Sequence, residues 1–190
     1  MKYQHAKRLI DVLASAVALA VLSPLLLVLA LAIRLESPGS PLFFQQRTGR
    51  GCKPFYIVKF RSMVKDASKL GSWQTAEGDP RITRLGRFIR ATSLDELPQL
   101  WNVLMGDMSL IGPRPNTPQQ ISQYPVGTWE KRHVLRPGIT GLSQVNGRSN
   151  LSIEQQIAYD LRYNEECSLM LDVHILLKTV TQVLRRAGVN

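Results

Sequence analysis

The sequence is poor in cysteine, histidine and acidic residues, and each shortage argues against a class of function. Cys52 and Cys167 stand far apart without CxxC spacing, and the three histidines are equally scattered. This pattern predicts no disulfide and no zinc site. The chain also lacks the GxxxxGK[ST] and GxGxxG motifs, which argues against P-loop and Rossmann nucleotide binding.

The shortage of acidic residues leaves a strongly basic chain. Twenty-four Lys and Arg face 14 Asp and Glu, a formal net charge of +10 in 190 residues. Such an excess favours polyanionic partners, namely nucleic acid, anionic lipid or a phosphorylated substrate. The length predicts one core with an appendage, and the 44% hydrophobic content is too high for a disordered basic tail.

The appendage is an N-terminal run, Val12 to Ile33, that contains no charged residue. A cleaved signal peptide is one interpretation, but its apolar region is usually only about 7–15 residues long. A single spanning helix is the second interpretation, because about 20 apolar residues suffice to cross a bilayer.

Two features of this run favour a third interpretation, a re-entrant helix. Ser23 and Pro24 lie almost at its centre, where proline removes a backbone hydrogen bond and kinks or breaks the helix. Both flanks are basic, which draws both ends to the cytoplasmic side: Lys2, Lys7 and Arg8 before the run, and Arg47, Arg50, Lys53, Lys59 and Arg61 after it. Each arm of about 11 residues would rise roughly 16 Å, half of the hydrocarbon layer. The Ser23 hydroxyl could bond a carbonyl freed at the bend.

The rest of the chain predicts a mostly α fold with a small β-hairpin. After the turn-rich linker at residues 37–41, the β-prone segment Phe55–Val58 and the turn glycines Gly49 and Gly51 indicate the hairpin. Residues 65–78 read as a loop, and Ser168–Arg186 as a helix that packs on the domain or lies in the membrane interface. We therefore divide the chain into a membrane segment, residues 1–36, and a cytosolic interfacial domain, residues 37–190.

A short basic helix is predicted just before the most informative motif. Leu85, Phe88 and Ile89 form its apolar side, and Arg84, Arg87 and Arg90 lie on its polar side. Beside a membrane segment, this pattern is typical of an interface helix that faces anionic lipid or phosphate. Lys59 and Arg61, on one face of an extended segment, are either solvated or phosphate contacts.

The motif itself is SLDELPQLWNVLMGDMSLIGPRP, which begins at Ser93 and contains the adjacent carboxylates Asp95 and Glu96. Ser93 and Glu96 have the spacing of a helix capping box, which would give both acids a structural explanation. Pro98 complicates that interpretation because it forfeits an early helical hydrogen bond.

Rigidly held arginines downstream favour a chemical role for the acids. They occur in Gly112–Pro115, Arg136–Gly141 and Asn146–Arg148, flanked by proline or glycine. A guanidinium suits bidentate phosphate binding, and an ionised aspartate can attack phosphorus to give an acyl phosphate. Mg²⁺ would be needed to screen the carboxylate from a diphosphate. Together these residues indicate phosphoryl transfer at a membrane surface.

Several segments resemble the bacterial sugar transferases, which are monotopic polyprenyl-phosphate phosphoglycosyl transferases. The segments are QQRTG, VKFRSM, FIRATSLDELPQLWNVLMGDMSLIGPRP and LRPGITGLSQVNGR, and the resemblance runs from Lys7 to about Gly188. It is to the minimal catalytic form, without the extra membrane helices and regulatory domain of longer members. Ser143 stands where alanine is common in the family, and Arg61-Ser62 varies a Lys/Arg-Thr pair.

The resemblance implies a reaction, a site and a location. Sugar-1-phosphate would pass from a UDP-sugar to undecaprenyl phosphate with release of UMP, through a sugar-phosphoryl aspartate, at the cytoplasmic face of the bacterial inner membrane. Asp95 would be the nucleophile and Mg²⁺ ligand, with Glu96 beside it, and Ser23-Pro24 the re-entrant break. The implied phosphate and substrate contacts are Arg114, Arg148, Lys59, Arg90, Pro113 and Asn146. The expected partners include anionic headgroups and a second copy of the chain, but not nucleic acid.

The competing hypothesis is a membrane-tethered basic module that binds lipid or nucleic acid. It accounts for the charge and the N-terminus, but it leaves Asp95 and Glu96 only a capping role. The Asp95→Asn change separates the two hypotheses: a binding module would keep its affinity and lose about 1 kcal/mol of stability at most.

Overall fold

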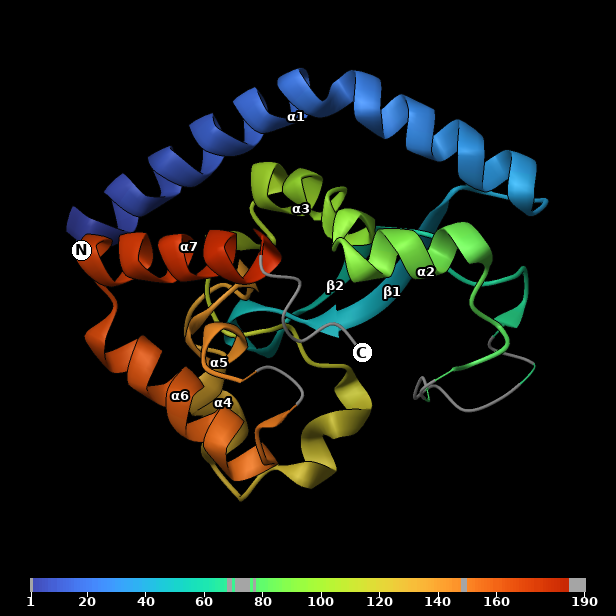
Figure 1. The fold of residues 1–190 in the computed structure, drawn as a ribbon. Coiled ribbons are helices and arrows are strands. Elements are labelled where there is room, and N and C mark those ends of the chain that lie inside the picture. The colour runs from blue at the N-terminus through green and yellow to red at the C-terminus, as the bar shows by residue number, and fades with distance from the viewer. Residues whose placement is uncertain (1, 68–69, 71–75, 77, 148–149, 185–190) are drawn as a thin grey trace.

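The computed structural model describes residues 2–67, 70, 76, 78–147 and 150–184. It is mostly helical with one antiparallel hairpin, as the sequence predicts (Figure 1). The elements, in chain order, are α1 (Lys2–Glu36), β1 (Leu42–Thr48), η1 (Arg50–Cys52), β2 (Pro54–Phe60), α2 (Arg84–Ala91), η3 (Leu94–Glu96), α3 (Gln99–Met105), β3 (Ser109–Ile111), η4 (Pro118–Gln123), α4 (Thr128–Arg132), β4 (Gly138–Thr140), α5 (Leu142–Val145), α6 (Ile153–Glu166) and α7 (Leu169–Leu184).

Helix α1 is continuous through Pro24, where the sequence predicted a helix, a break and a second helix. The Ser23 hydroxyl donates to the Ala20 carbonyl at 2.8 Å. That carbonyl has lost its usual donor because proline carries no N–H, so the side chain replaces the missing bond as expected. The helix is bowed instead of broken, and its middle arches away from the rest of the molecule (Figure 1).

Both ends of α1 contact the same domain. Near its start, Tyr3 and Lys7 bond the Asp172 carboxylate of α7 at 2.8 and 2.7 Å. At its end, Glu36 accepts from the backbone N–H of Leu85 at 3.0 Å. Leu29 and Ile33 pack with Phe60 of β2 and Ile89 of α2 in one core cluster. The middle is largely exposed and apolar, and α1 is long and apolar enough to cross a membrane.

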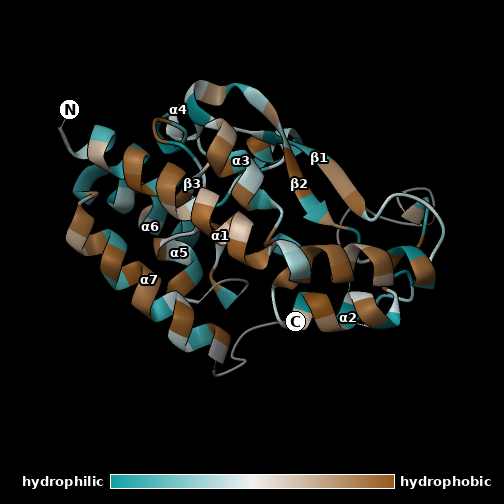
Figure 2. Cartoon of the chain, turned by 90° about the horizontal axis from the view of Figure 1, so that it is seen from above, coloured by the Kyte–Doolittle hydropathy of each residue, from teal (hydrophilic) through white to brown (hydrophobic). Residues whose placement is uncertain are grey.

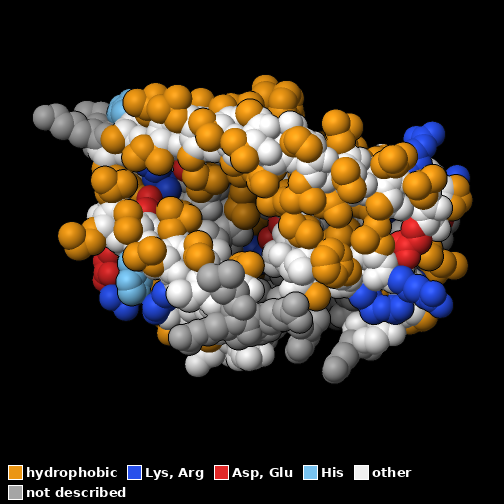
Figure 3. Space-filling view, turned by 45° about the horizontal axis from the view of Figure 1, so that its top comes forward, with side chains coloured by type: hydrophobic (Ala, Val, Ile, Leu, Met, Phe, Trp, Pro, Cys, Tyr) orange, Lys and Arg blue, Asp and Glu red, His pale blue; other side chains and the backbone are white. Residues whose placement is uncertain are grey.

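The exposed apolar surface continues beyond α1. Leu177 and Met170 of α7, Trp101 and Met105 of α3, and Phe88 of α2 are all more than half exposed. Phe88 therefore lies outside the core, although its spacing placed it with Leu85 and Ile89. Figure 2 shows long hydrophobic stretches on α1 and α7, and Figure 3 shows hydrophobic side chains gathered over α1 and neighbouring elements.

The hairpin and a second pair of strands form the platform of the site. Strands β1 and β2 pair antiparallel with Arg47 opposite Phe55 and Phe43 opposite Lys59. Opposed residues share a face, so Arg47 and Lys59 project from the same side. Strands β3 and β4 form a short parallel pair that the sequence analysis did not predict. There Gly112 and Gly138 approach so closely that a Cβ on Gly138 would lie 2.1 Å from the Gly112 nitrogen.

Candidate active site

The carboxylate pair lies on a short 3-10 turn, and the predicted capping box is wrong. Ser93 adopts a left-handed conformation with φ 58°, and its side chain caps nothing. The turn η3 covers only Leu94–Glu96, and α3 begins at Gln99, directly after Pro98. Proline lacks the N–H that a helix continued through residue 98 would use, so the turn and α3 stay separate. Glu96 is drawn instead to cations from other elements.

Glu96 is held by two cations. Its Oε1 accepts from Lys59 Nζ of β2 at 2.7 Å and from Arg114 Nη2 at 3.3 Å. Burial alone would raise the pKa of Glu96, but the charges of Arg114 and Lys59 outweigh it and lower that pKa to about 2. Burial disfavours the charged form of Lys59 and so lowers its pKa, although the Glu96 charge opposes the shift. Glu96 is therefore a fixed anion that orients Lys59 and Arg114.

Asp95 differs from Glu96 in its environment. It is only 9% exposed, and no donor among the described residues is hydrogen bonded to its carboxylate. Burial, followed by the neighbouring charge of Glu96, raises the pKa of Asp95 to about 6. Lys59, Arg90 and Arg114 oppose that shift, so the group stays largely ionised at neutral pH. Asp95 is thus a buried carboxylate whose oxygens accept no hydrogen bond from the part of the chain that the structure describes.

The arginines that the sequence singled out fall into separate places. Arg114, which is exposed, bonds Glu96, whereas Arg90 donates to the Ser62 hydroxyl at 2.8 Å and acts on Asp95 through its charge. Arg61 does not reach the site, because it bonds the Ser37 and Pro38 carbonyls of the linker at 2.5 and 2.7 Å. Arg148 lies outside the described residues.

Arg114 is presented by a loop whose successive carbonyls are all bonded. The Pro113 carbonyl accepts from the Gly138 N–H at 2.9 Å, and the Asn116 carbonyl from the Thr48 N–H at 2.9 Å. Between them, Arg132 Nη2 donates to the Arg114 carbonyl at 2.7 Å and Arg47 Nη1 to the Pro115 carbonyl at 3.0 Å. Pro113 thus acts through its backbone, and the loop is fixed by strand β4, the hairpin and α4.

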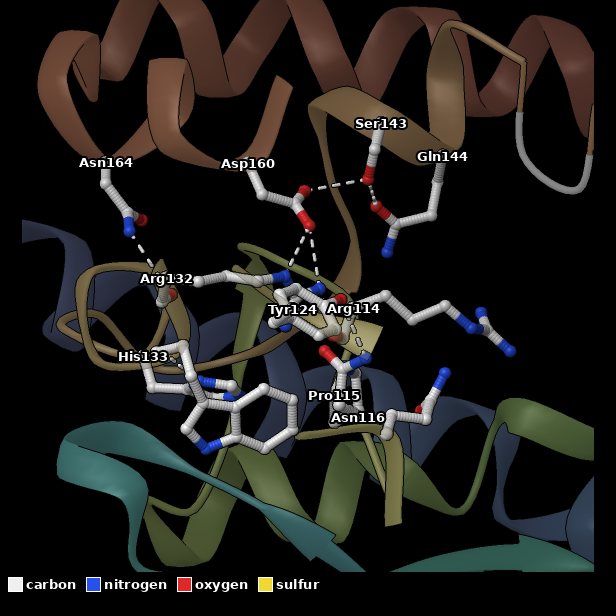
Figure 4. Close-up of polar contacts among 12 residues, drawn as sticks. Arg114, Pro115, Asn116, Tyr124, Arg132, His133, Ser143, Gln144, Asp160 and Asn164 are labelled. Atoms are coloured by element: carbon white, nitrogen blue, oxygen red, sulfur yellow. Dashed lines mark hydrogen bonds and ion pairs between the residues drawn. The ribbon is translucent and has the colours of Figure 1, made fainter. Parts of the chain in front are cut away.

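Arg132 is itself held by a buried acid, as Figure 4 shows. Its guanidinium pairs with Asp160 of α6 at 2.7 Å, and the two side chains are 4% and 1% exposed. The Ser143 hydroxyl donates to the other Asp160 oxygen at 2.8 Å. Ser143 therefore adds a hydrogen bond that an alanine could not make. The buried pair connects α6 and α5 to the loop that carries Arg114.

A profile of the bacterial sugar transferases matches residues 2–186. The chain belongs to this family. Among its relatives, a UDP-glucose:undecaprenyl-phosphate glucose-1-phosphate transferase of Caulobacter vibrioides is 46% identical over 94% of this chain and 69% of its own length. A UDP-N-acetylgalactosamine-undecaprenyl-phosphate N-acetylgalactosaminephosphotransferase of Aeromonas hydrophila is 42% identical over 98% of this chain and 45% of its own length.

Relatives of this transferase differ in length. The chain spans less than half of the Aeromonas protein but 96% of the exopolysaccharide production protein PSS of Rhizobium leguminosarum, which is 42% identical over 95% of this chain. Membership of the family therefore rests on nearly the whole chain, as the motifs predicted.

Arg47 and Gln99 are site residues that the sequence analysis missed. They line one pocket together with Lys59, Glu96 and Arg114. Burial, followed by the charge of Arg114, lowers the pKa of Arg47 to about 10, and its buried Nε has no partner among the described residues. The signal was the hairpin itself, because an antiparallel register through Gly49–Gly51 puts Arg47 and Lys59 on one face.

Asn146 is a predicted site residue whose polar contacts lie elsewhere. It donates to the Leu142 carbonyl at 2.8 Å and accepts from Lys178 of α7 at 3.3 Å. In this transferase it joins the end of α5 to α7, a role that fits its place at the end of a short helix.

The residues of the site fit a magnesium ion that takes part of its ligands from the protein and the rest from a phosphorylated substrate and water. Within the described part of the chain, no group of three or more His, Cys, Asp and Glu could hold a metal ion. Mg²⁺, however, usually binds one or two carboxylates and completes its shell with phosphates and water. Asp95 supplies an oxygen ligand that no described side chain or backbone group engages, and Glu96 is adjacent but engaged by Lys59 and Arg114.

Proposed function

We propose that the protein transfers a sugar-1-phosphate from a UDP-sugar to undecaprenyl phosphate and releases UMP. The names of the Caulobacter and Aeromonas relatives support the substrates. One observation carries the chemistry: of two adjacent carboxylates, Glu96 is neutralised by Lys59 and Arg114, whereas no described residue donates a hydrogen bond to Asp95. A buried, unpaired carboxylate beside fixed cations suits nucleophilic attack on a diphosphate.

In the first step, an Asp95 oxygen attacks the phosphorus that bears the sugar. The new P–O bond gives an acyl phosphate, while the bond to the UMP oxygen breaks and UMP leaves with the electron pair. Arg47, Lys59 and Arg114 line one pocket with Glu96, the neighbour of Asp95, and neutralise the charge that builds on the phosphates. Arg47 is bonded to the Pro115 carbonyl and Lys59 to Glu96 before substrate binds, so little reorganisation of these two cations opposes the reaction.

In the second step, a phosphate oxygen of undecaprenyl phosphate attacks the same phosphorus. The acyl-phosphate bond breaks, the Asp95 carboxylate is restored, and the product is a polyprenyl diphosphate sugar. Mg²⁺ bound at Asp95, when present, would supply positive charge that screens the diphosphate from the carboxylate. Glu96 keeps Lys59 and Arg114 in place throughout.

The Asp95→Asn variant tests this function by UMP release from a panel of UDP-sugars with undecaprenyl phosphate. We expect turnover to fall at least about a thousandfold, because an amide is not a nucleophile for phosphorus. Glu165→Gln is the matched control, since Glu165 is an exposed carboxylate on α6. An Asp95→Asn protein that released UMP at the original rate would exclude this mechanism. A binding module would keep its affinity and show no turnover in either form.

We also propose that α1 enters the bilayer and returns, so that the domain lies on the cytoplasmic face of the inner membrane. Tyr3 and Lys7 at its start and Glu36 at its end all bond one domain, which supports this topology. A spanning helix would separate its ends by a hydrocarbon layer of about 30 Å.

Cysteine labelling tests this topology in a chain freed of Cys52 and Cys167. Cysteines introduced singly at Lys2 and Ser40 should both react only when the cytoplasmic side is exposed to a membrane-impermeant reagent. Reaction from opposite sides would show a spanning helix instead.

A further inference from the structure

A second pocket lies where the start of α1 meets the end of α3. Among the described residues, it shares no lining residue with the pocket of Lys59, Glu96 and Arg114. Lys7, Arg8 and Asp11 of α1 line it, together with Arg50 of η1 and Arg136, which precedes β4. We call it the α1–α3 basic pocket. Its described lining holds four cations and one acid, although nothing in the proposed phosphoryl transfer requires them.

Part of this charge has a structural explanation. Arg8 donates to the Val103 and Leu104 carbonyls at 2.6 and 3.0 Å, and Arg136 Nε donates to the Gly106 carbonyl at 2.8 Å. Cations at the carboxyl end of a helix stabilise it, so these two arginines cap α3. Lys7 is paired with Asp172 at 2.7 Å.

The remaining charge has no such explanation. Among the described residues, the exposed side chain of Arg50 and the two terminal nitrogens of Arg136 have no hydrogen-bond partner. Asp11 is 3% exposed and accepts from the Leu110 N–H at 3.1 Å. Burial, followed by the charges of Arg8 and Arg50, lowers the pKa of Arg136. Three guanidiniums thus repel one another around a space lined by one engaged acid, and an anion there would relieve the repulsion.

The place of the pocket along α1 indicates which anion. Arg8 lies about one helical turn, roughly 6 Å, before the uncharged run that begins at Val12. Leu9 beside it is 61% exposed and Met105 at the end of α3 is 60% exposed, so apolar surface borders the pocket. If the uncharged run enters hydrocarbon, Arg8 stands at the depth of the lipid phosphates.

We propose that the α1–α3 basic pocket binds the phosphate group of an anionic membrane lipid between Arg8, Arg50 and Arg136. Such a lipid would fix the depth and tilt of the domain at the bilayer surface. The inference uses the membrane placement of α1 but not the chemistry of Asp95. Its test therefore measures binding, which the Asp95→Asn variant should retain.

The test is native mass spectrometry of the full chain released from nanodiscs that contain equal phosphatidylglycerol and phosphatidylcholine. The wild-type chain should retain phosphatidylglycerol in preference to phosphatidylcholine. Arg50→Gln removes a side chain that bonds no described residue, and it should weaken retention about tenfold, the effect of one charge-assisted hydrogen bond. Arg162→Gln is the matched control: it removes the same charge from an exposed position on α6.

A parallel titration with inorganic phosphate in detergent separates two sources of the same chemistry. Phosphatidylglycerol enrichment that Arg50→Gln abolishes and Arg162→Gln preserves supports the lipid site. Phosphate binding that depends on Arg50, without lipid enrichment, would overturn the lipid assignment in favour of a soluble phosphate. If Arg50→Gln and Arg162→Gln behave alike in both assays, the pocket binds no phosphate group.

Discussion

At the residue scale, Asp95 and Glu96 are neighbours in sequence with opposite pKa shifts. Glu96 lies between Lys59 and Arg114 at 2.7 and 3.3 Å. Among the described residues, Asp95 has no bonded cation, and the charges of Lys59, Arg90 and Arg114 offset its burial in part. A carboxylate held by two cations is a poor nucleophile because its electron pairs are engaged. Asp95, to which no described residue donates, is therefore the better candidate for the nucleophile.

The raised pKa of Asp95 predicts the pH dependence of the first half-reaction. Only the carboxylate attacks phosphorus, so UMP release should fall about tenfold per pH unit below about 6. Glu96, with a pKa of about 2, stays ionised over that range. The measurement is UMP formation without acceptor, because undecaprenyl phosphate carries a titrating group of its own. A rate that stays constant down to about pH 4 would contradict the assignment.

The same shift predicts that Asp95→Asn stabilises the fold. Burial raises the pKa of Asp95 from 3.8 to about 6, so the fold favours the protonated side chain. The stability that protonation contributes is full below about pH 3.8 and is lost as the pH rises through 6. At neutral pH the ionised side chain costs on the order of 2–3 kcal/mol, which the amide avoids. The melting temperature should rise by several degrees.

Glu96→Gln is the contrasting variant for this prediction. It leaves the 16%-exposed Lys59 side chain without its counter-charge and should destabilise the fold by a few kcal/mol. If Asp95 served only to stabilise the start of a helix, Asp95→Asn would lower the stability of the fold by about 1 kcal/mol at most. A lower melting temperature for Asp95→Asn would therefore restore the capping explanation.

At the element scale, the loop that carries Arg114 depends on elements far from the carboxylates. Arg132 of α4 reaches its backbone, and Asp160 of α6 holds Arg132. Arg132→Lys keeps the charge but cannot bond both the Arg114 carbonyl and Asp160 in this geometry. We expect kcat/KM for the UDP-sugar to fall roughly tenfold, with most of the loss in KM.

Two further measurements separate positioning from a general loss of structure. Lys131→Ala removes an exposed cation beside Arg132 and should leave kcat/KM unchanged. The pH profile of Arg132→Lys should keep the Asp95 limb near 6, because that group is untouched. An unchanged kcat/KM in a folded Arg132→Lys protein would show that Arg132 has no part in positioning.

Pro24 governs the shape of α1. The Ser23 hydroxyl bonds the carbonyl that proline leaves free, which keeps the helix continuous while it bows. Pro24→Leu restores the backbone bond, and a straight apolar helix would favour a full span. We expect a cysteine at Lys2 to become reactive from the periplasmic side in part of the population. Labelling confined to the cytoplasmic side would show that the contacts of both helix ends with the domain suffice to keep α1 re-entrant without Pro24.

Part of this element structure could be predicted from sequence. Periodicity located α2 and α7, and the turn glycines Gly49 and Gly51 located the hairpin. The β3–β4 pair could not be predicted because each strand has three residues and its partner is distant in sequence. The capping box failed because Ser93 turns left-handed and long-range cations compete for Glu96.

Part of the candidate site could also be predicted from the sequence. Glu96, Lys59 and Arg114, which local motifs singled out, line one pocket, and Asp95 is the chain neighbour of Glu96. Arg132 and Asp160 escaped because no local pattern marks a buried ion pair between α4 and α6. Arg90 and Asn146 have partners outside the pocket, which only tertiary packing decides.

At the scale of the whole molecule, apolar and charged surfaces are divided. Exposed apolar side chains of α1, α3 and α7 gather on the face in Figure 3, and charged side chains appear at its edges and in hollows between them. Both ends of α1 contact the same domain, so its exposed apolar middle adds to a single face suited to lipid. The pocket that contains Lys59 and Arg114 belongs to the same domain. This arrangement would bring a soluble nucleotide sugar and a lipid phosphate to one pocket.

In the proposed mechanism, Asp95 carries the sugar phosphate from one substrate to the other. The most direct measurement is a single-turnover reaction of the full chain with labelled UDP-sugar and no acceptor, followed by intact-mass analysis and peptide mapping. We expect a burst of UMP equimolar with the enzyme and a mass gain of one sugar phosphate on the peptide that contains Asp95. The added mass should be lost when undecaprenyl phosphate is supplied. UMP that forms only after acceptor is added, with no adduct at any stage, would contradict this mechanism.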